Sequence, residues 1–138
     1  MNAIHQAYDA VQRSWTGQQW DAWAATCAPD YEFDTGTGLR LDLAGTVDWS
    51  RAWFTAFPDY AEDIRALHPA PNSAVAELIG RATAVNDFVV AGVTVLPATG
   101  RRFEIAYAKV LVFDADVKVV RDRQYLDTAA LLRQFGPS

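Results

Sequence analysis

The segment Arg102–Gly136 reads RFEIAYAKVLVFDADVKVVRDRQYLDTAALLRQFG, and the architecture we expect for the whole chain starts from it. Two runs of β-branched and aromatic residues flank the short polar connection Asp114–Asp116, which is typical of an antiparallel β-hairpin. After the second run, the apolar residues change to helical spacing, which predicts a terminal helix from Thr128 to Phe135. Three polar residues interrupt the apolar runs, at Lys109, Asp122 and Gln124. A strand that served only the core would not carry them, so we expect this hairpin to form one wall of the functional site.

Upstream of the hairpin, apolar spacing predicts three helices. The first covers residues 3–16, with one apolar stripe made by Ile4, Tyr8, Val11 and Trp15. A second, short helix carries Trp20, Trp23, Ala24 and Cys27 on one side and is broken at Pro29. The third begins near Thr46, a plausible N-cap, and ends before Pro58, because a residue that precedes proline is pushed out of the α region.

The remaining segments read as strands and loops. Residues 31–34 predict a brief strand, and the two glycines of residues 35–38 predict a loop. The apolar period changes to two over residues 60–68 and 74–85, which predicts two further strands. Residues 86–100 hold a proline and two glycines, and we expect an irregular segment that overhangs another part of the molecule.

Together these elements predict an α+β fold in a single domain, residues 1–138. Three N-terminal helices would pack on a strongly curved antiparallel sheet, and the short terminal helix would close the chain. A curved sheet wrapped round a long first helix gives a cone-shaped α+β barrel with a blind apolar hollow. Such a hollow is a ready site for a small molecule.

Composition and charge exclude several classes of function. The chain has 138 residues, 51% of them hydrophobic, and a net charge of −5. This charge argues against binding to nucleic acid and to anionic membranes. The single cysteine, Cys27, cannot form an internal disulfide, no apolar run reaches the ~20 residues that span a bilayer, and the first residues lack the pattern of a secretion signal. We therefore expect a cytoplasmic protein.

Several motifs resemble those of the SnoaL-like polyketide cyclases, within the superfamily of nuclear transport factors and ketosteroid isomerases. They are APDY (28–31), FPDYAEDI (57–64), LPATGRRF (96–103), VKVVRDRQYLD (117–127) and LLRQFG (131–136). The resemblance implies a small cofactor-free enzyme, a lyase or isomerase, that closes a ring on a polyketide by intramolecular aldol condensation, and it implies a homodimer. The superfamily also holds epoxide hydrolases, dehydratases, hydroxylases and members without catalysis, so the fold alone does not fix the chemistry.

The resemblance also points to positions in the site, and this chain departs from the family pattern at each of them. The acid/base aspartate of the cyclases falls on Gln124, and a family histidine falls on or near Lys109. The base of the ketosteroid isomerases falls on Thr35, with Asp34 one residue away. A Gly-Thr-His-like stretch of relatives is represented by residues 85–87, which makes Asn86 a candidate for substrate binding.

Alternation along the last strand places Asp122 on the same face as Gln124. A carboxyl group that faces an apolar hollow has a raised pKa, so Asp122 is our candidate for a replacement acid/base. Lys109 could stabilise an enolate, and the Gln124 amide could hold a carbonyl group. The alternatives remain open: a salt bridge for Asp122 and solvent exposure for Lys109 and Gln124.

Aromatic residues suit the walls of such a site. We expect Trp15, Phe33, Trp53, Phe88 and Tyr107 to contact a flat apolar ligand, although the same side chains could simply form the core. No His, Cys, Asp or Glu set has metal-ligand spacing, so we expect no metal and no cofactor.

Three functions are compatible with these patterns. The first is a cyclase or isomerase that removes a proton next to a carbonyl of an apolar polycyclic or polyketide substrate. The second is a non-catalytic protein that binds such a metabolite, since both inherited base positions lack a base. The third is an epoxide hydrolase, for which Asp34 with Glu62 or Asp63 is the one loose carboxylate pair.

Overall fold

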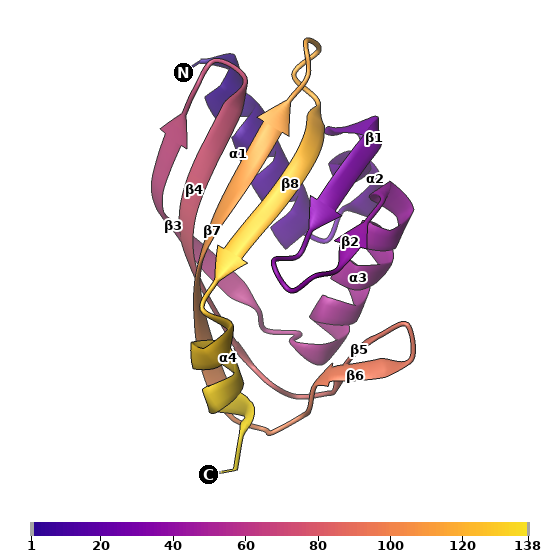
Figure 1. Cartoon of the computed structure of the whole chain (residues 1–138), viewed down its shortest axis with the longest axis vertical. Helices are drawn as coiled ribbons and strands as arrows, with labels where there is room; N and C mark the ends of the chain where they lie inside the picture. The colour runs from indigo at the N-terminus through magenta and orange to yellow at the C-terminus, as the bar shows by residue number, and fades with distance from the viewer. Residues whose placement is uncertain (1, 138) are drawn as a thin grey trace.

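The computed structural model describes residues 2–137 and confirms the α+β class (Figure 1). Its helices are α1 (Ala3–Thr16), α2 (Trp20–Ala24), α3 (Leu43–Ala56) and α4 (Thr128–Phe135). Its strands are β1 (Cys27–Asp34), β2 (Arg40–Leu41), β3 (Ala61–Pro69), β4 (Ser73–Thr83), β5 (Phe88–Val90), β6 (Val93–Leu96), β7 (Arg102–Phe113) and β8 (Val119–Leu126). The predicted strands 60–68 and 74–85 thus correspond to β3 and β4 with small shifts at their ends.

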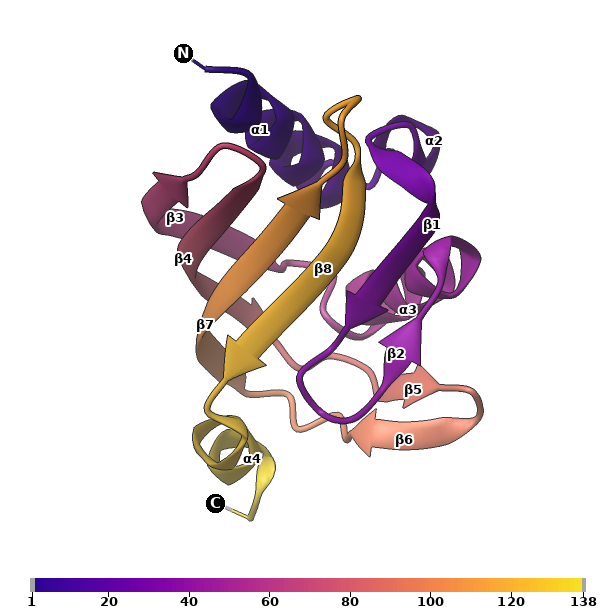
Figure 2. The same cartoon turned by 45° about the horizontal axis from the view of Figure 1, so that its top comes forward.

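The main sheet has six strands in the order β2-β1-β8-β7-β4-β3. The predicted hairpin is β7 and β8, which pair antiparallel with Lys109 opposite Gln124. The prediction of an antiparallel sheet is wrong in one place, because β1 runs parallel to β8, with Phe33 opposite Asp122. This pairing joins segments from opposite ends of the chain, so no local turn signal announces it. Figures 1 and 2 show β1 beside β8.

The first and last helices have the predicted bounds. The Asn2 side chain accepts a hydrogen bond from the backbone N–H of His5 and so caps α1, which ends at Gly17. Asp127 caps α4, since its Oδ1 accepts a hydrogen bond of 3.0 Å from the backbone N–H of Ala130. The side chains of these caps satisfy N–H groups that have no partner inside the helix.

The start of α3 and the end of α2 differ from the prediction. The N-cap of α3 is Asp42, whose Oδ1 accepts from Gly45 N at 2.7 Å, and not Thr46. Thr46 lies in the first turn, where its hydroxyl donates to the carbonyl of Asp42. Cys27 belongs to β1, which starts four residues before the predicted Tyr31. The first difference arises because Asp42 and Thr46 are both residue types that cap helices. The second arises because pairing with neighbouring strands, and not local propensity, determines where β1 begins.

The segment 86–100 is not irregular throughout, since it contains the hairpin β5–β6. Its turn is Ala91-Gly92, and both residues have positive φ, 51° and 79°. Two-residue hairpin turns of this kind match the twist of the flanking strands, but glycine or asparagine usually occupies the first position. Because alanine occupies residue 91, the sequence pattern did not predict this turn.

Helices α1 and α3 lie against one face of the main sheet, and α4 lies beyond the end of β8 (Figures 1 and 2). Two clusters of buried side chains fill the space between the layers, one centred on α1 and β4 and the other on α3, β7 and α4. Trp15, Trp49 and Tyr107 pack against both clusters and join them. Within residues 2–137, no helix has the length and apolar character needed to cross a bilayer.

Candidate active site

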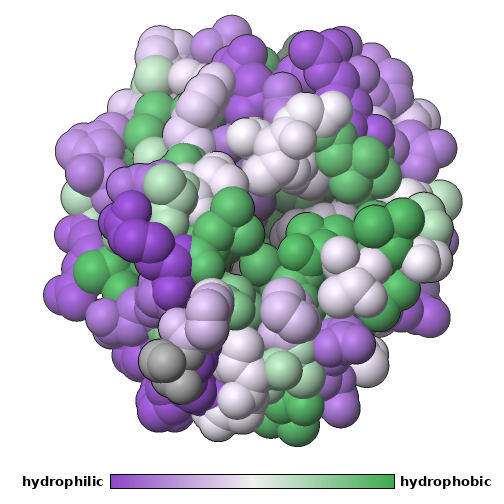
Figure 3. Space-filling view, turned by 60° about the horizontal axis from the view of Figure 1, so that its bottom comes forward, coloured by the Kyte–Doolittle hydropathy of each residue, from purple (hydrophilic) through white to green (hydrophobic). Residues whose placement is uncertain are grey.

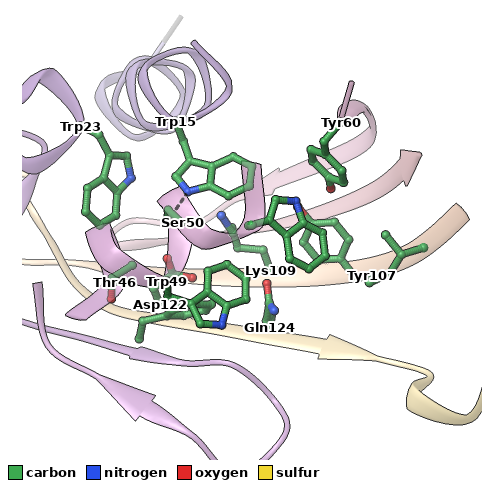
Figure 4. A pocket seen from close by; sticks show the side chains of 13 residues that line it. Trp15, Trp23, Thr46, Trp49, Ser50, Tyr60, Tyr107, Lys109, Asp122 and Gln124 are labelled. Atoms are coloured by element: carbon green, nitrogen blue, oxygen red, sulfur yellow. Dashed lines mark hydrogen bonds between the residues drawn. The ribbon is translucent and has the colours of Figure 1, made fainter. Parts of the chain in front are cut away.

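A small cavity lies between the helices and the inner face of β7 and β8, where the two clusters meet. We call it the inner cavity, and its volume is about 30 Å³. Most of its wall is aromatic: Trp15, Trp23, Phe33, Trp49, Trp53, Tyr60 and Tyr107. Thr46, Ser50, Ile105, Lys109, Asp122 and Gln124 complete it. Figure 4 shows the three polar residues of the β7–β8 hairpin directed towards the tryptophans of the helices.

Among the described residues that line this cavity, Asp122 is the one carboxylate. Its side chain is only 5% exposed. Its Oδ2 accepts a hydrogen bond of 2.8 Å from the hydroxyl of Tyr31, whereas its Oδ1 is buried and has no partner among the described residues. Desolvation raises the pKa of Asp122, although the charge of Lys109 and the hydrogen bond from Tyr31 act in the opposite direction. A carboxyl group of this kind can take up and release a proton nearer to neutral pH than an exposed aspartate can.

Lys109 extends into the cavity and not into solvent. Its Nζ lies 5.8 Å from the centroid of the Trp15 ring, a cation–π distance. Within residues 2–137, no ion pair joins Lys109 to a carboxylate. The Trp15 indole is itself held by a hydrogen bond of 3.0 Å from its Nε1 to Ser50 Oγ, drawn in Figure 4. The cavity thus contains one buried acid and one cation that are not bonded to each other.

Gln124 lines the inner cavity from β8, two residues beyond Asp122. Its Nε2 donates a hydrogen bond of 3.2 Å to the carbonyl of Thr35, in the loop between β1 and β2. This loop passes directly over β8, since a Cβ at Gly36 would lie 2.3 Å from the backbone oxygen of Gln124. Gly36 also has a φ of +80°, so both conformation and space require glycine there.

The sequence did not predict that Tyr60 and Tyr107 would both bind Glu62. Tyr60 and Tyr107 each donate a hydrogen bond of 2.6 Å to Glu62 Oε1, and Gln12 of α1 donates to Oε2. Burial, and the nearby Glu62, raise the pKa of Tyr60 far above its ordinary value, so its hydroxyl stays protonated. The sequence feature that could have predicted the contact of Tyr60 with Glu62 is strand alternation, which places both residues on one face. The network orients two of the rings that line the inner cavity.

A second, larger cavity opens next to the first. We call it the outer chamber; its volume is about 350 Å³. The β5–β6 hairpin, the 35–39 loop, α3 and α4 enclose it, so the segment 86–100 overhangs this space as predicted. Of the described residues that line it, none is charged: Thr35, Thr37, Leu39, Trp49, Trp53, Phe88, Val90, Ala91, Val95, Leu96, Ile105, Gln124, Leu126, Thr128, Leu131 and Leu132. Figure 3 shows the apolar side chains gathered round a hollow at this end of the molecule.

The two cavities share four residues, Trp49, Trp53, Ile105 and Gln124. The Trp49 and Trp53 rings are stacked, with centroids 5.4 Å apart and an interplanar angle of 16°. These residues form the partition between a polar inner end and an apolar outer space. This is the usual layout of a small-molecule site, in which apolar walls bind and a few polar groups orient.

The structure brings most of the predicted site residues together. Asp122, Gln124, Lys109, Trp15, Phe33, Trp53 and Tyr107 line the inner cavity, and Phe88 lines the outer chamber. Asn86 is not brought to either space. It is exposed, and its Nδ2 donates to the carbonyl of Thr55 at 2.8 Å. Its observed contact is therefore with the end of α3.

Other candidate groups lie elsewhere. Asp34 on β1 faces Arg40, Asp63 on β3 pairs with Arg81, and Glu62 binds the tyrosines. Strands β1 and β3 stand four places apart in the sheet, so these carboxylates cannot share one water, and the pair considered for an epoxide hydrolase is wrong. Burial raises the pKa of Cys27 to about 12, which argues against a nucleophilic thiolate. Residues 2–137 contain no group of three or more His, Cys, Asp or Glu side chains that could hold a metal ion.

Solved structures share this arrangement of elements. A SnoaL-like polyketide cyclase from Agrobacterium tumefaciens superposes with a TM-score of 0.79 at 24% identity, over 99% of this chain and 100% of that one. An NTF2-like protein from Burkholderia thailandensis gives 0.79 at 20% identity, over 99% and 100%. A Catenulispora acidiphila protein with a ketosteroid isomerase-like fold, solved with trimethylamine, gives 0.75 at 15% identity, over 96% and 93%. At these identities the likeness shows the fold.

No curated protein matches the chain significantly. The sequence pattern of the SnoaL-like polyketide cyclases, however, matches residues 5–135, which include every strand, α2 to α4, all but the first two residues of α1 and both cavities. This match agrees with the motifs quoted above and with the solved structures. The chain therefore belongs to the SnoaL-like polyketide cyclase family and has the NTF2/ketosteroid isomerase-like fold.

Proposed function

We propose that this protein is an acid/base enzyme that removes a proton next to a carbonyl group of a neutral, apolar, ring-bearing small molecule. The observation that carries the proposal is the free Oδ1 of Asp122, a buried carboxylate oxygen in the wall of a cavity that adjoins an apolar chamber. A carboxyl group without a compensating partner is costly to bury, and such groups are concentrated at sites of proton transfer. The proposal includes no cofactor, because its steps are proton transfers and, in a cyclisation, attack of the enolate carbon on a carbonyl group.

The substrate would place its apolar body in the outer chamber and its carbonyl end towards Gln124. A volume of about 350 Å³ is in the range of small-molecule sites. The indole rings of Trp49 and Trp53 would stack on a flat ring system, and Phe88 would contact it from the β5–β6 hairpin. Because the chamber is uncharged, an ionic substrate would lose its hydration without gaining a partner.

The chemistry begins when the carbon next to the carbonyl loses a proton, which the Asp122 carboxylate finally holds. The electron pair moves to the carbonyl oxygen, and the Lys109 ammonium stabilises the enolate charge. In an aldol cyclisation, the enolate carbon attacks a second carbonyl of the same molecule, and protonated Asp122 returns the proton to the new alkoxide. In an isomerisation, the proton returns to a different carbon. Either course regenerates the carboxylate.

The first prediction concerns Asp122→Asn, which keeps the shape of the side chain but cannot accept a proton. With β-tetralone, a neutral bicyclic ketone with acidic protons beside its carbonyl, native protein should accelerate hydrogen–deuterium exchange, read by NMR. The variant should lose about a hundredfold or more of this acceleration. Asp116→Asn, in the exposed β7–β8 turn, is the matched control and should retain it.

Parental rates in Asp122→Asn would disprove the assignment of Asp122. If native protein bound β-tetralone and a panel of polyketide ketones without accelerating exchange in any of them, the non-catalytic binding function would replace the enzymatic one. The motif resemblance places Gln124, whose amide cannot accept a proton, where the cyclases have their aspartate, and this supports the second function.

A homodimer is part of the proposal, and the second prediction tests it. The sheet face away from the helices exposes Tyr125 and carries Ile79, Ala106 and Ala108 beside it in register. The same groove also carries Arg65 and Glu77, and a face of paired strands that mixes apolar and charged side chains suits a second copy of this chain. Light scattering should give a dimer mass for native protein and a lower mass for Tyr125→Glu. A native protein that is monomeric at all concentrations would contradict this.

A further inference from the structure

Two buried polar atoms in this site have no hydrogen-bond partner among the described residues, Asp122 Oδ1 and Trp53 Nε1. Both side chains are more than nine-tenths buried, with exposures of 5% and 7%. Both residues line the inner cavity. One atom accepts hydrogen bonds and the other donates them, so one small molecule with both capacities would satisfy the pair.

The size of the inner cavity limits what this molecule can be. A volume of about 30 Å³ is far below the roughly 350 Å³ of the outer chamber, and it exceeds the roughly 10–15 Å³ that one water requires. Buried waters typically make about three hydrogen bonds to polar groups that would otherwise lack a partner. Lys109 and Ser50 line the same space and offer further contacts.

The position of the acid relative to the chamber gives the second observation. Asp122 lines the inner cavity but not the outer chamber, where a substrate body fits. Gln124 does reach the chamber, but its amide cannot carry a proton at neutral pH. A proton that leaves a substrate in the chamber therefore needs a carrier between the partition and the Asp122 carboxylate.

We propose that the inner cavity holds one fixed water, bound by Asp122 Oδ1 and Trp53 Nε1, and that Asp122 exchanges protons with the substrate through this water. The indole N–H donates to the water oxygen, and one O–H of the water donates to Oδ1. The second lone pair of the oxygen faces the partition and the substrate. This role in catalysis rests on the proposed function, whereas the water site itself does not.

The step balances without consuming water. The substrate carbon loses its proton to the water oxygen while the water passes its own proton to Asp122, and the electron pair of the broken C–H bond becomes the enolate. The return step reverses the transfer and restores both the water and the carboxylate. Trp53 is a positioning residue for this transfer, since it orients the water and exchanges no proton.

The first test needs no substrate. Crystal structures at high resolution of native protein and of Trp53→Phe should show the water within hydrogen-bond distance of Asp122 Oδ1 and Trp53 Nε1 in the first, and a displaced or absent water in the second. A dry inner cavity in the native protein, or direct contact between Asp122 Oδ1 and Lys109 Nζ, would overturn the inference.

The second test measures transfer through the water. Loss of a β-tetralone proton should be slower in heavy water than in ordinary water, because a solvent proton moves in the same step. Trp53→Phe should react about tenfold more slowly, which corresponds to the loss of one neutral hydrogen bond. Trp49→Phe removes the indole stacked on Trp53 but leaves the Trp53 N–H in place. Its rate should fall less, and the rate difference between the two solvents should remain. Equal native rates in both solvents would overturn the relay. Absence of any acceleration would refute the proposed function and leave the crystallographic test of the water site in force.

Discussion

At the scale of the residue, the two polar groups of β8 that line the cavities are Asp122 and Gln124, one step of strand alternation apart. Gln124, where the motif resemblance places the aspartate of the cyclases, lines both cavities, whereas Asp122 lines only the inner one. The inner position has a cost, because Tyr31 satisfies only one of the two carboxylate oxygens. A pKa raised by desolvation is the measurable result of that burial.

This pKa shift predicts how stability depends on pH. Between the unfolded pKa, for which the ordinary value is 3.8, and the raised folded pKa, native Asp122 holds its proton while the unfolded chain has released it. The native state then binds more protons, so the free energy of unfolding falls as pH rises through this window. Urea unfolding of Asp122→Asn should show a smaller fall from about pH 4 to pH 7 than native protein.

Asp116→Asn provides the control for that series, since its exposed side chain lies outside both cavities. If native protein and Asp122→Asn gave parallel plots of unfolding free energy against pH, the pKa of Asp122 would not be raised in the folded state.

At the scale of the element, Glu62 connects three parts of the fold around the inner cavity. It receives Gln12 from α1, Tyr107 from β7 and Tyr60 from the turn before β3. Tyr60 also lies directly on β4, where a Cβ at Gly80 would meet its hydroxyl. Glycine at residue 80 thus leaves the room in which the Tyr60 ring packs.

Glu62→Ala should destabilise the protein, because it leaves the buried hydroxyls of Tyr60 and Tyr107 without an acceptor. Each orphaned group costs about 1–3 kcal/mol, so the loss in unfolding free energy should exceed 1 kcal/mol, measured by urea denaturation. Asp63→Ala, one residue along β3, breaks an exposed pair with Arg81 and should cost about 0–1 kcal/mol. Equal losses for the two variants would mean that the Glu62 network carries no special stability.

The elements that were predicted correctly are those whose sequence signals lie within the element or its adjacent turn. Apolar spacing predicted α1 and α4, and the polar turn at residues 114–116 predicted the β7–β8 hairpin. The parallel pairing of Phe33 with Asp122 has no local signal, and Ala91 at positive φ hides the β5–β6 turn. Alternation placed Asp122 and Gln124 on one face, but it could not show that Lys109 points inwards, since side-chain direction there depends on the packing of α1.

At the scale of the whole molecule, the two cavities lie in series from the apolar end of the fold to its centre. The outer chamber meets solvent between the β5–β6 hairpin, the 35–39 loop and α4. The large apolar side chains left exposed at this rim include Leu39, Val95 and Leu132. Their exposure is unfavourable in the free protein, and a bound apolar ligand would cover it.

Leu132→Ser should therefore weaken binding of β-tetralone, because it removes apolar area from the chamber wall. A loss of about 1 kcal/mol corresponds to a Kd raised roughly fivefold, followed by tryptophan fluorescence since Trp49 and Trp53 line the chamber. Val85→Ser removes an equally exposed side chain outside the chamber and should leave Kd unchanged. A similar Kd for both variants would place the ligand elsewhere.

The parallel contact of β1 with β8 has a consequence for how the protein is made. During synthesis β1 leaves the ribosome early and can pair with β2, but β8 emerges only after residues 35–118 have been added. Until then Tyr31 and Phe33 lack their neighbours on β8, and the pocket has neither its acid nor its amide. Until β8 has been synthesised, these rings can associate with other chains. Pairing of β8 with β1 then completes the core and the site in the same folding step.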